Sequence, residues 1–223
     1  KAYKYRIYPT SEQRLYLAKT FGCTRFVYNQ MLADRIKSYE ENKDLDIKAI
    51  KYPTPAQYKK KYEWLKEVDS LALANAQMNL DKAYKNFFRD KSVGFPKFKS
   101  KKTNRFSYTT NNQNGTISVD GNFVKIPKLK SKIKIVLHRQ FKGLIKSATI
   151  SKTPSNQYYI SILVVDTEKI SLPKNDNKIG IDLGIKEFAI CSNGDRFDNP
   201  KNLRKSEKKL VKLQKDLSRK VKG

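Results

Sequence analysis

Stretches in which apolar and polar residues alternate occur at the start of the chain and again in its middle. The first runs from Ala2 to Tyr8 and ends at Pro9. Between residues 106 and 166 the period is again two, and Asn-Gly, Asp-Gly and Pro-Ser-Asn turn signals separate the runs. The strands predicted there are 106–109, 116–119, 123–126, 133–137, 146–153 and 158–165. Together these runs predict a small antiparallel barrel that the first strand closes.

Helical periodicity fills the gap between the first strand and the others. A hydroxyl at Thr10 followed by Glu12 and Gln13 predicts a helix start, and apolar residues then recur at helical spacing to about residue 41. Gly22 predicts a break into two helices. Further helices are predicted at 57–64 and 70–89. The helices at 11–90 are therefore expected to be an insertion between the first two strands of the barrel.

The eleven residues from Ile179 to Ala189 predict a buried strand, a tight turn and a second strand. Ile181 and Leu183 fall on one face, and Asp182 falls on the other between two glycines, which leave open space beside it. Burying a carboxylate in so apolar a strand is costly without a partner or a cation. Asp182 is thus a candidate metal ligand, while an Asp that simply opens a turn remains the alternative. A third strand at 196–198 and a basic helix from about 201 to 220 follow.

The charge changes this picture most. Lys and Arg number 48 against 21 acidic residues, a net charge of +27, which favours a protein that binds a polyanion. Sugar kinases open with a similar Asp-x-Gly strand, but they have no use for such a charge. Residues 91–105 carry six basic and no acidic residues, interleaved with Phe95 and Phe98. Cations beside aromatic rings suit a phosphate backbone with a base stacked alongside. The alternative is a solvated loop whose two phenylalanines are buried in the core.

Other features set bounds. Cys23 and Cys191 are the only cysteines and lie far apart, so they predict neither a zinc site nor a disulfide framework. His138 lies in a basic run and is expected at the surface or facing a phosphate. No membrane span or signal peptide is visible, so no membrane partner is expected. The expected location is the cytoplasm, in association with the nucleoid. The chain begins at Lys1, and the natural start is expected just upstream.

Four stretches in fixed order resemble one family. They are Phe21–Asn29 (FGCTRFVYN), Ala83–Phe88 (AYKNFF), Gly94–Lys99 (GFPKFK) and the Asp182 segment. Over essentially the whole chain they resemble the TnpB (OrfB) proteins of insertion-sequence transposons, relatives of the type V CRISPR effectors. The resemblance implies an α+β fold with three parts. These are a wedge-type antiparallel β-barrel (1–10 and 105–172), an inserted helical recognition lobe with a helix-turn-helix and a basic loop (11–104), and the first segment of an RNase H-like (RuvC) domain (176–223).

The resemblance also implies partners and site residues. Members of this bacterial and archaeal family bind a guide RNA made from the transposon end, recognise a short motif beside double-stranded target DNA, and cut that DNA with Mg²⁺. Asp182 would be the catalytic metal ligand. Residues expected to read the DNA motif are Tyr52, Ser70, Ala74, Asn75, Thr109 and Thr110, which otherwise merely cap a helix or fill a barrel face. Residues expected to contact nucleic-acid backbone are Arg25, Lys97, Lys99, Lys101, Lys102, Arg105, Arg204, Lys208 and Lys212.

The chain also departs from the family pattern. Cleavage in the family uses three carboxylates and a zinc-binding cysteine cluster, and only Asp182 has a counterpart here; the others, and zinc, are expected downstream of Gly223. One carboxylate cannot hold two Mg²⁺ ions in the geometry that hydrolysis needs. The chain alone is therefore predicted to bind nucleic acid without cutting it. It is either the N-terminal portion of an RNA-guided endonuclease or a truncated, cleavage-inactive relative such as a repressor or transposon remnant. An RNA-binding translation protein unrelated to transposons is the third hypothesis.

Overall fold

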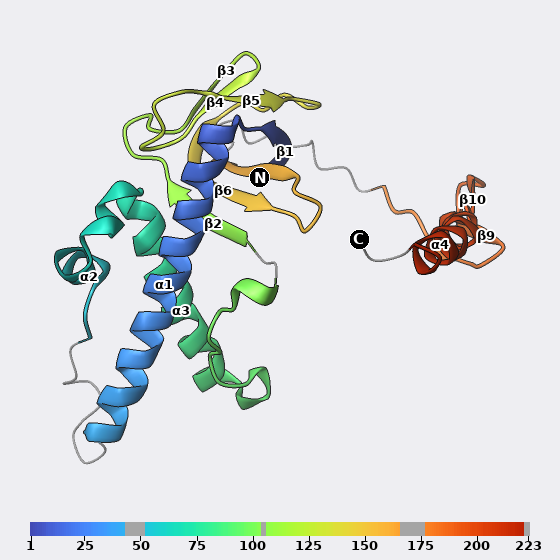
Figure 1. Ribbon diagram of the computed structural model, residues 1–223. Coiled ribbons are helices and arrows are strands. Elements are labelled where there is room, and N and C mark those ends of the chain that lie inside the picture. Colours follow the sequence, from blue (N-terminus) through green and yellow to red (C-terminus); the bar gives the residue numbers. More distant parts are fainter. Residues whose placement is uncertain (43–51, 104–105, 166–176, 221–223) are drawn as a thin grey trace. The chain divides into compact units, whose positions relative to one another are not determined.

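The structure is a computed structural model that describes residues 1–42, 52–103, 106–165 and 177–220. The chain divides into two compact units, Lys1–Lys169 and Ile170–Gly223 (Figure 1). The first unit joins a seven-stranded sheet to helices, and the second carries a three-stranded sheet and one helix. Every strand pair is antiparallel, so the mixed helix and antiparallel-sheet class expected from the sequence is confirmed.

The large sheet contains each strand that the alternating pattern predicted. Its order is β2-β6-β7-β1-β5-β4-β3, with the N-terminal strand in the middle between β7 and β5. The strands are β1 (Ala2–Tyr8), β2 (Phe106–Asn111), β3 (Ser118–Asp120), β4 (Phe123–Lys125), β5 (Ile133–Val136), β6 (Leu144–Lys152) and β7 (Tyr158–Val165). In sequence the helices lie between β1 and β2, as expected for an insertion.

The predicted closed barrel is not found: β2 and β3 are the two ends of the sheet, and no pairing joins them within the described residues. The turn after β2 explains why. Its first residue, Asn112, donates its backbone N–H to Lys146 and its side-chain amide to Ile145, both on β6. The Asn112 side chain then accepts the Ile117 N–H at 2.8 Å. The turn is thus satisfied by β6 and by its own side chain rather than by a ladder between β2 and β3.

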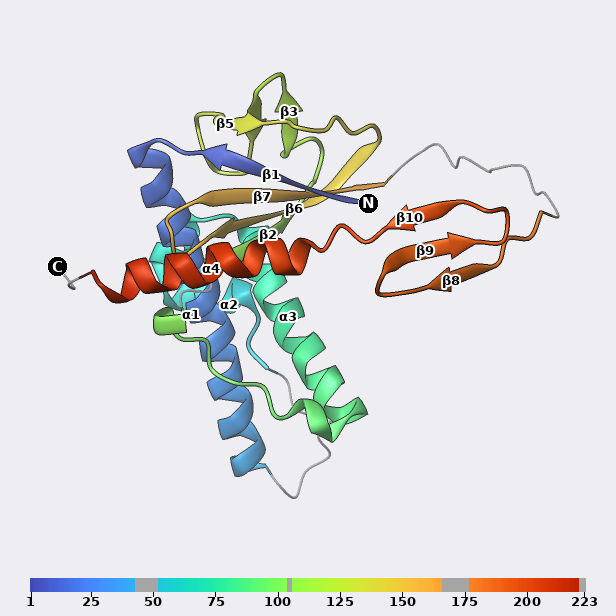
Figure 2. The same cartoon turned by 90° about the vertical axis from the view of Figure 1, so that its right-hand side faces the viewer.

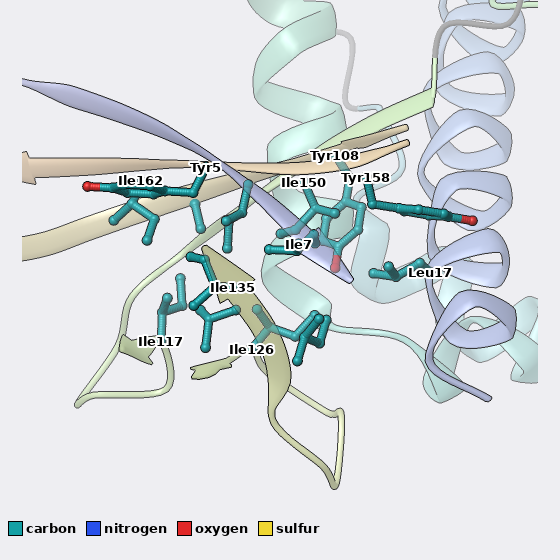
Figure 3. Packing of buried hydrophobic residues seen from close by; sticks show 14 of the residues in the cluster. Tyr5, Ile7, Leu17, Tyr108, Ile117, Ile126, Ile135, Ile150, Tyr158 and Ile162 are labelled. Atoms are coloured by element: carbon teal, nitrogen blue, oxygen red, sulfur yellow. The ribbon is translucent and has the colours of Figure 1, made fainter. Parts of the chain in front are cut away.

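Although open, the sheet curves around one apolar core. Figure 3 shows Tyr108 of β2, Ile150 of β6 and Ile162 of β7 facing Ile126 and Ile135 from the other end of the sheet. Leu17 of the first helix completes the core (Figure 3). Burial of this inward face fixes the register of every strand, because a slip of one residue would expose the whole apolar set.

Helix α1 (Ser11–Glu41) is continuous, so the break predicted at Gly22 is wrong. It starts at a capping box in which Thr10 and Gln13 exchange hydrogen bonds. Residues on both sides of Gly22 are held by separate cores: Leu17 packs in the sheet core, and Val27 packs in a second core formed among the helices. This packing outweighs the cost of about 1 kcal/mol for a glycine inside a helix.

Further helical segments follow α1 in the helical lobe. Helix α2 (Pro55–Lys61) and a short 3₁₀ helix (Glu63–Glu67) replace the single helix predicted at 57–64. Helix α3 (Ser70–Arg89) agrees with the prediction at 70–89. The carboxylate of Asp69 begins α3 by accepting the N–H groups of Leu71 and Ala72, both at 3.2 Å. In Figure 1, α3 runs beside α1 below the sheet.

The second unit follows the predicted order of strands and helix. It contains β8 (Ile181–Leu183), β9 (Glu187–Cys191), β10 (Arg196–Asp198) and α4 (Asn202–Ser218), with sheet order β10-β9-β8 (Figure 2). The expectation of a buried strand is wrong: Ile181 is 59% exposed and Leu183 is 71% exposed. Three short strands and one helix shield little, and in this unit the buried apolar residues among those described are Ala189 and Cys191.

Candidate nucleic-acid interface

A cavity of about 460 Å³ lies where α1, α3, β2 and the basic segment before β2 meet. Its size falls within the range of ~300–1,000 Å³ typical of small-molecule sites. Five residues that the sequence singled out line it, although they come from four different segments: Arg25, Asn75, Lys97, Lys99 and Thr109. The other lining residues are Phe21, Thr24, Ala72, Ala76, Asn79, Phe98, Ser100, Thr103, Phe106, Ser107 and Tyr108.

Helix α3 makes the cavity hollow because it presents short side chains there. Ala72, Asn75, Ala76 and Asn79 recur at helical spacing and all line the cavity. Asn75 donates its Nδ2 to the carbonyl of Leu71 at 2.8 Å, which fixes the amide against its own helix. Within the described residues, neither Oδ1 of Asn75 nor the amide of Asn79 has a hydrogen-bond partner. The wall therefore offers the side-chain oxygen of Asn75 and the side-chain amide of Asn79 to an occupant.

The basic segment is held as a fixed wall rather than a free loop. The side-chain amide of Asn29 on α1 accepts the Lys99 N–H at 2.8 Å and donates to the Lys99 carbonyl at 2.9 Å. The Lys99 ammonium lies 3.9 Å from the centre of the Tyr28 ring. Phe95 is 46% exposed and Phe98 is 56% exposed, so the alternative that both are buried in the core is wrong.

The cavity is strongly cationic. Arg25, Lys97 and Lys99 line it, and none of the lining residues is acidic. Part of the Lys99 side chain stays exposed, yet desolvation by the surrounding protein lowers the pKa of its ammonium. Arg25 and Lys97 have no ion-pair partner in the described parts of the chain. Charges gathered without partners repel one another, so an anion in the cavity would relieve that repulsion.

The remaining predicted motif readers on α3 and β2 lie around this cavity in different settings. Thr109 shares a 2.8 Å hydrogen bond with the hydroxyl of Thr149. Thr110 has no exposed surface, and its hydroxyl donates to the Asp69 carboxylate, so it acts on the cavity through the start of α3. Ser70 is exposed and its hydroxyl accepts a hydrogen bond from Lys59. Ala74 is half-buried and does not line the cavity.

Tyr52 belongs to another cluster, built around Arg35 of α1. The Arg35 guanidinium lies 5.2 Å from the Tyr52 ring centre and 5.3 Å from that of Tyr84, and it pairs with Asp81. Tyr52 is thus fixed by a cation–π contact and does not line the cavity. Sequence reasoning missed Arg35, since a single arginine on a helix gives no local pattern.

Asp182 lies exposed on β8 of the second unit. Its register partner is Ile190 on β9, whose own partner on β10 is Arg196, so these three residues share one sheet face. This register agrees with the expected alternation of side chains along β8, although the glycine after Asp182 has another purpose than the one expected. A Cβ at Gly184 would lie 3.0 Å from the Glu187 carbonyl oxygen, so that glycine serves the turn between the strands.

A free carboxylate is the oxygen ligand that Mg²⁺ prefers, so Asp182 fits a metal-binding role as one ligand. Within the described ranges, no three His, Cys, Asp or Glu residues gather where they could share a metal ion. An ion pair on this sheet joins Arg196 to Glu187 at 3.5 Å. Asp182 can therefore supply one coordinating group, and any others must come from elsewhere.

The other basic residues are at the surface. Arg204, Lys208 and Lys212 recur every four residues along α4 and are exposed, so they form one cationic stripe. Lys101 and Lys102 are exposed on a short 3₁₀ helix, and Arg105 lies outside the described residues. None of the helices that the structure describes combines the length and apolar character needed to cross a bilayer.

Two family models match stretches of the chain. The family model of the OrfB-IS605 helix-turn-helix domain matches residues 1–44, and that of the OrfB-IS605 "Probable transposase" matches residues 161–223. A "Putative RNA-guided DNA endonuclease" of Streptomyces pristinaespiralis is 32% identical, with 100% of this chain and 56% of that protein aligned. "Putative RNA-guided DNA endonuclease InsQ" of Escherichia coli (strain K12) is 31% identical over 100% of this chain and 54% of its own length.

A shorter relative is also similar. "Virulence protein VsdF" of Salmonella dublin is 40% identical, with 45% of this chain and 93% of that protein aligned. The chain thus spans little more than half the length of the two endonuclease relatives and most of the length of the third. Within the stretch that the helix-turn-helix model matches, the described residues form β1 and the single helix α1.

Proposed function

Because this chain belongs to the OrfB (TnpB) family of transposon-encoded proteins, we propose that it is the nucleic-acid-binding portion of an RNA-guided DNA endonuclease. The observation that carries the proposal is the cationic cavity, where five predicted nucleic-acid contacts from four segments meet without any acidic residue. A guide RNA from the transposon end and double-stranded target DNA are the proposed partners. Base pairing would select the sequence, while the protein holds the backbone through charge.

The finer domain assignments belong to the same proposal. The first unit would be the wedge domain with its inserted recognition lobe, and the second would be the first segment of a RuvC domain. Support for the latter comes from β8 and α4, whose apolar residues are exposed: Ile181 is 59% exposed and Leu203 is 79% exposed. Faces of this kind are stable when further elements of an RNase H-like domain cover them.

Asp182 would be one ligand of Mg²⁺, which supplies activation of water and stabilisation of the leaving oxygen in DNA hydrolysis. Its carboxylate is exposed on a strand and free to coordinate. The predicted zinc site is a proposal for segments outside this chain.

The short DNA motif would be read where α3 and β2 border the cavity. Asn75 lines the cavity there, and its free amide oxygen can accept a hydrogen bond from the N6 amine of an adenine edge. Thr109 adds a hydroxyl from β2. Tyr52, which Arg35 fixes from a separate cluster, would contact DNA next to this region.

Sequencing of the RNA that copurifies with the chain tests the proposal. We expect one predominant RNA species from the transposon end, because a guide bound through a shaped surface is retained selectively. A matched preparation in which Lys97 and Lys99 are replaced by Gln should lose that RNA. Recovery of only ribosomal or random RNA from the unaltered chain would contradict a guide-binding function.

The role of Asp182 is tested in a polypeptide extended to the full length of the endonuclease relatives. Asp182→Ala should abolish Mg²⁺-dependent DNA cleavage because a metal ligand is lost, while guide and target binding persist. Asp195→Ala, in the turn between β9 and β10, is the control and should retain cleavage. Cleavage by Asp182→Ala at a rate near that of the unaltered enzyme would exclude the assignment.

A second candidate is a relative that binds nucleic acid without cutting it. It is favoured by the similarity to the shorter VsdF protein, of which 93% aligns with this chain. The 223-residue chain should then bind RNA or DNA yet show no Mg²⁺-dependent cleavage. Reproducible cutting by a clean preparation would rule this candidate out.

A further inference from the structure

We propose that the cavity between α1, α3 and β2 binds a single nucleotide turned out of its strand, with adenine as the preferred base. This inference rests on the proposed nucleic-acid binding and names the unit that enters the site. A duplex cannot enter a volume of about 460 Å³, so it can meet only the mouth of the cavity. One unstacked nucleotide can enter, and sequence-specific recognition of RNA commonly uses bases splayed out of a strand.

The basic residues that line the cavity would bind the phosphate group of the nucleotide. Arg25, Lys97 and Lys99 come from α1 and from the basic segment, and all three line the cavity. The main chain of Lys99 is held by a double hydrogen bond to Asn29, so the backbone that carries this side chain does not depend on a flexible loop for its position. A phosphate would supply the negative charge that is absent from the lining of the cavity.

The aromatic rings account for the stacking of the base. Phe98 and Phe106 line the cavity on either side of the residues that lead into β2. Phe98 is 56% exposed, so its ring is accessible to a base that enters the cavity. Stacking of one base on an aromatic ring contributes ~1–3 kcal/mol.

The amides account for the choice of base. Asn79 lies one turn after Asn75 on α3, and its amide has both donor and acceptor free within the described residues. That pair of groups matches N7 and the N6 amine of adenine. Uracil offers no such amine. Ala72 and Ala76, on the same helix face, leave the room that the base would occupy.

Binding of free nucleoside monophosphates to the whole chain tests this site. Adenosine 5′-monophosphate and uridine 5′-monophosphate are titrated and followed by saturation-transfer NMR. We expect the adenine nucleotide to bind at least about fivefold more tightly, from the worth of a paired amide. Absence of adenosine monophosphate binding at millimolar concentration, in a chain that still binds RNA, would overturn the inference.

Two matched pairs of variants locate the site. Asn79→Asp places a carboxylate in the cavity and should weaken adenosine monophosphate binding at least about tenfold by repelling the phosphate. Gln77→Glu makes the same change in charge on α3 away from the cavity and should have little effect. Phe98→Ala should weaken binding by loss of stacking, while Phe88→Ala, 67% exposed and outside the lining, should not. Equal effects within either pair would overturn the inference.

A strand-level measurement separates this inference from the proposed function. A single-stranded RNA with a central 2-aminopurine should change fluorescence on binding, as the base leaves its stack, and the change should be lost in Asn79→Asp. If the RNA binds without any change, the nucleotide inference fails and the proposed function stands. If the chain binds no RNA at all, the proposed function fails, and the titration with free nucleotides still decides whether the cavity binds one.

Discussion

At the scale of single residues, Thr110 shows how a buried hydroxyl can shape the cavity without lining it. Its side chain has no exposed surface and donates to Asp69, the residue whose carboxylate also caps α3. Asn75 and Asn79 follow on that helix and line the cavity. The Thr110–Asp69 hydrogen bond therefore fixes β2 against the start of the helix that carries the amides.

Removal of this hydrogen bond should destabilise the fold. Thr110→Val keeps the shape and leaves the buried carboxylate with one donor fewer, so we expect a loss of ~1–3 kcal/mol in the free energy of unfolding. The control is Thr109→Val, which removes a partly exposed hydroxyl that shares a hydrogen bond with Thr149, and it should lose less. Urea denaturation measures both, and a cycle with Asp69→Ala should show coupling of ~0.5–3 kcal/mol. If the losses of stability caused by the Asp69 and Thr110 substitutions were simply additive, the hydrogen bond between these residues would be contradicted.

Individual residues also show what could and could not be predicted from the sequence. Asn75 and Lys99 were predicted as contacts and line the cavity, but Asn79 was missed although it lies four residues after Asn75 on the same helix. Helical spacing could have identified it. Asn29 was quoted only within a motif, because its partner Lys99 is 70 residues away in sequence and nothing local predicts that pairing.

At the scale of elements, α1 links the two cores of the first unit. Leu17 packs in the sheet core and Val27 in the helical core, so one helix must pass through Gly22 without a break. The sequence predicted the extent of the helical region correctly and its continuity wrongly, because local glycine preference was overridden by tertiary packing. Likewise, a period of two predicted the strands, but closure of a barrel depends on the pairing of distant edges, which alternation does not encode.

The continuity of α1 can be tested by substituting glycines. An added Cβ at Gly22 meets nothing within 4 Å, so Gly22→Ala should raise the free energy of unfolding by ~0.5–1 kcal/mol through better helix propensity. Gly94 is equally free of contacts but has φ of +79° and ψ of 161°, a conformation that essentially only glycine adopts, so Gly94→Ala should destabilise the protein by ~1–3 kcal/mol. Urea midpoints of the two variants should move in opposite directions. A loss of stability in Gly22→Ala would mean that the helix bends there.

At the scale of the whole molecule, charge and apolar packing are distributed differently. Both apolar cores lie within the first unit, whereas the second unit holds few buried residues among those described and many exposed ones. The excess of Lys and Arg in the composition predicted a polyanion as the class of partner. It could not predict which cations gather, because the basic segment, α1 and α3 meet only in the folded chain. Positive charge is thus concentrated in the lining of the cavity, in addition to the net charge of +27 that the whole chain carries.

This distinction determines how affinity should depend on salt. Replacing Lys97, Lys99, Lys101 and Lys102 by Gln should lower RNA affinity and reduce the slope of log affinity against log salt by about 3 units, if each contacts a phosphate. The control replaces Lys125, Lys130, Lys134 and Lys142, all exposed in other segments, and removes the same charge. That variant should change the slope by less than about 1 unit, because lysines far from bound phosphates release no counterions. Fluorescence titrations of an RNA hairpin at several salt concentrations give both slopes. If the two quadruple variants had equal slopes, RNA would bind through the charge of the whole surface. The position of a lysine affects the slope only when that lysine contacts a bound phosphate.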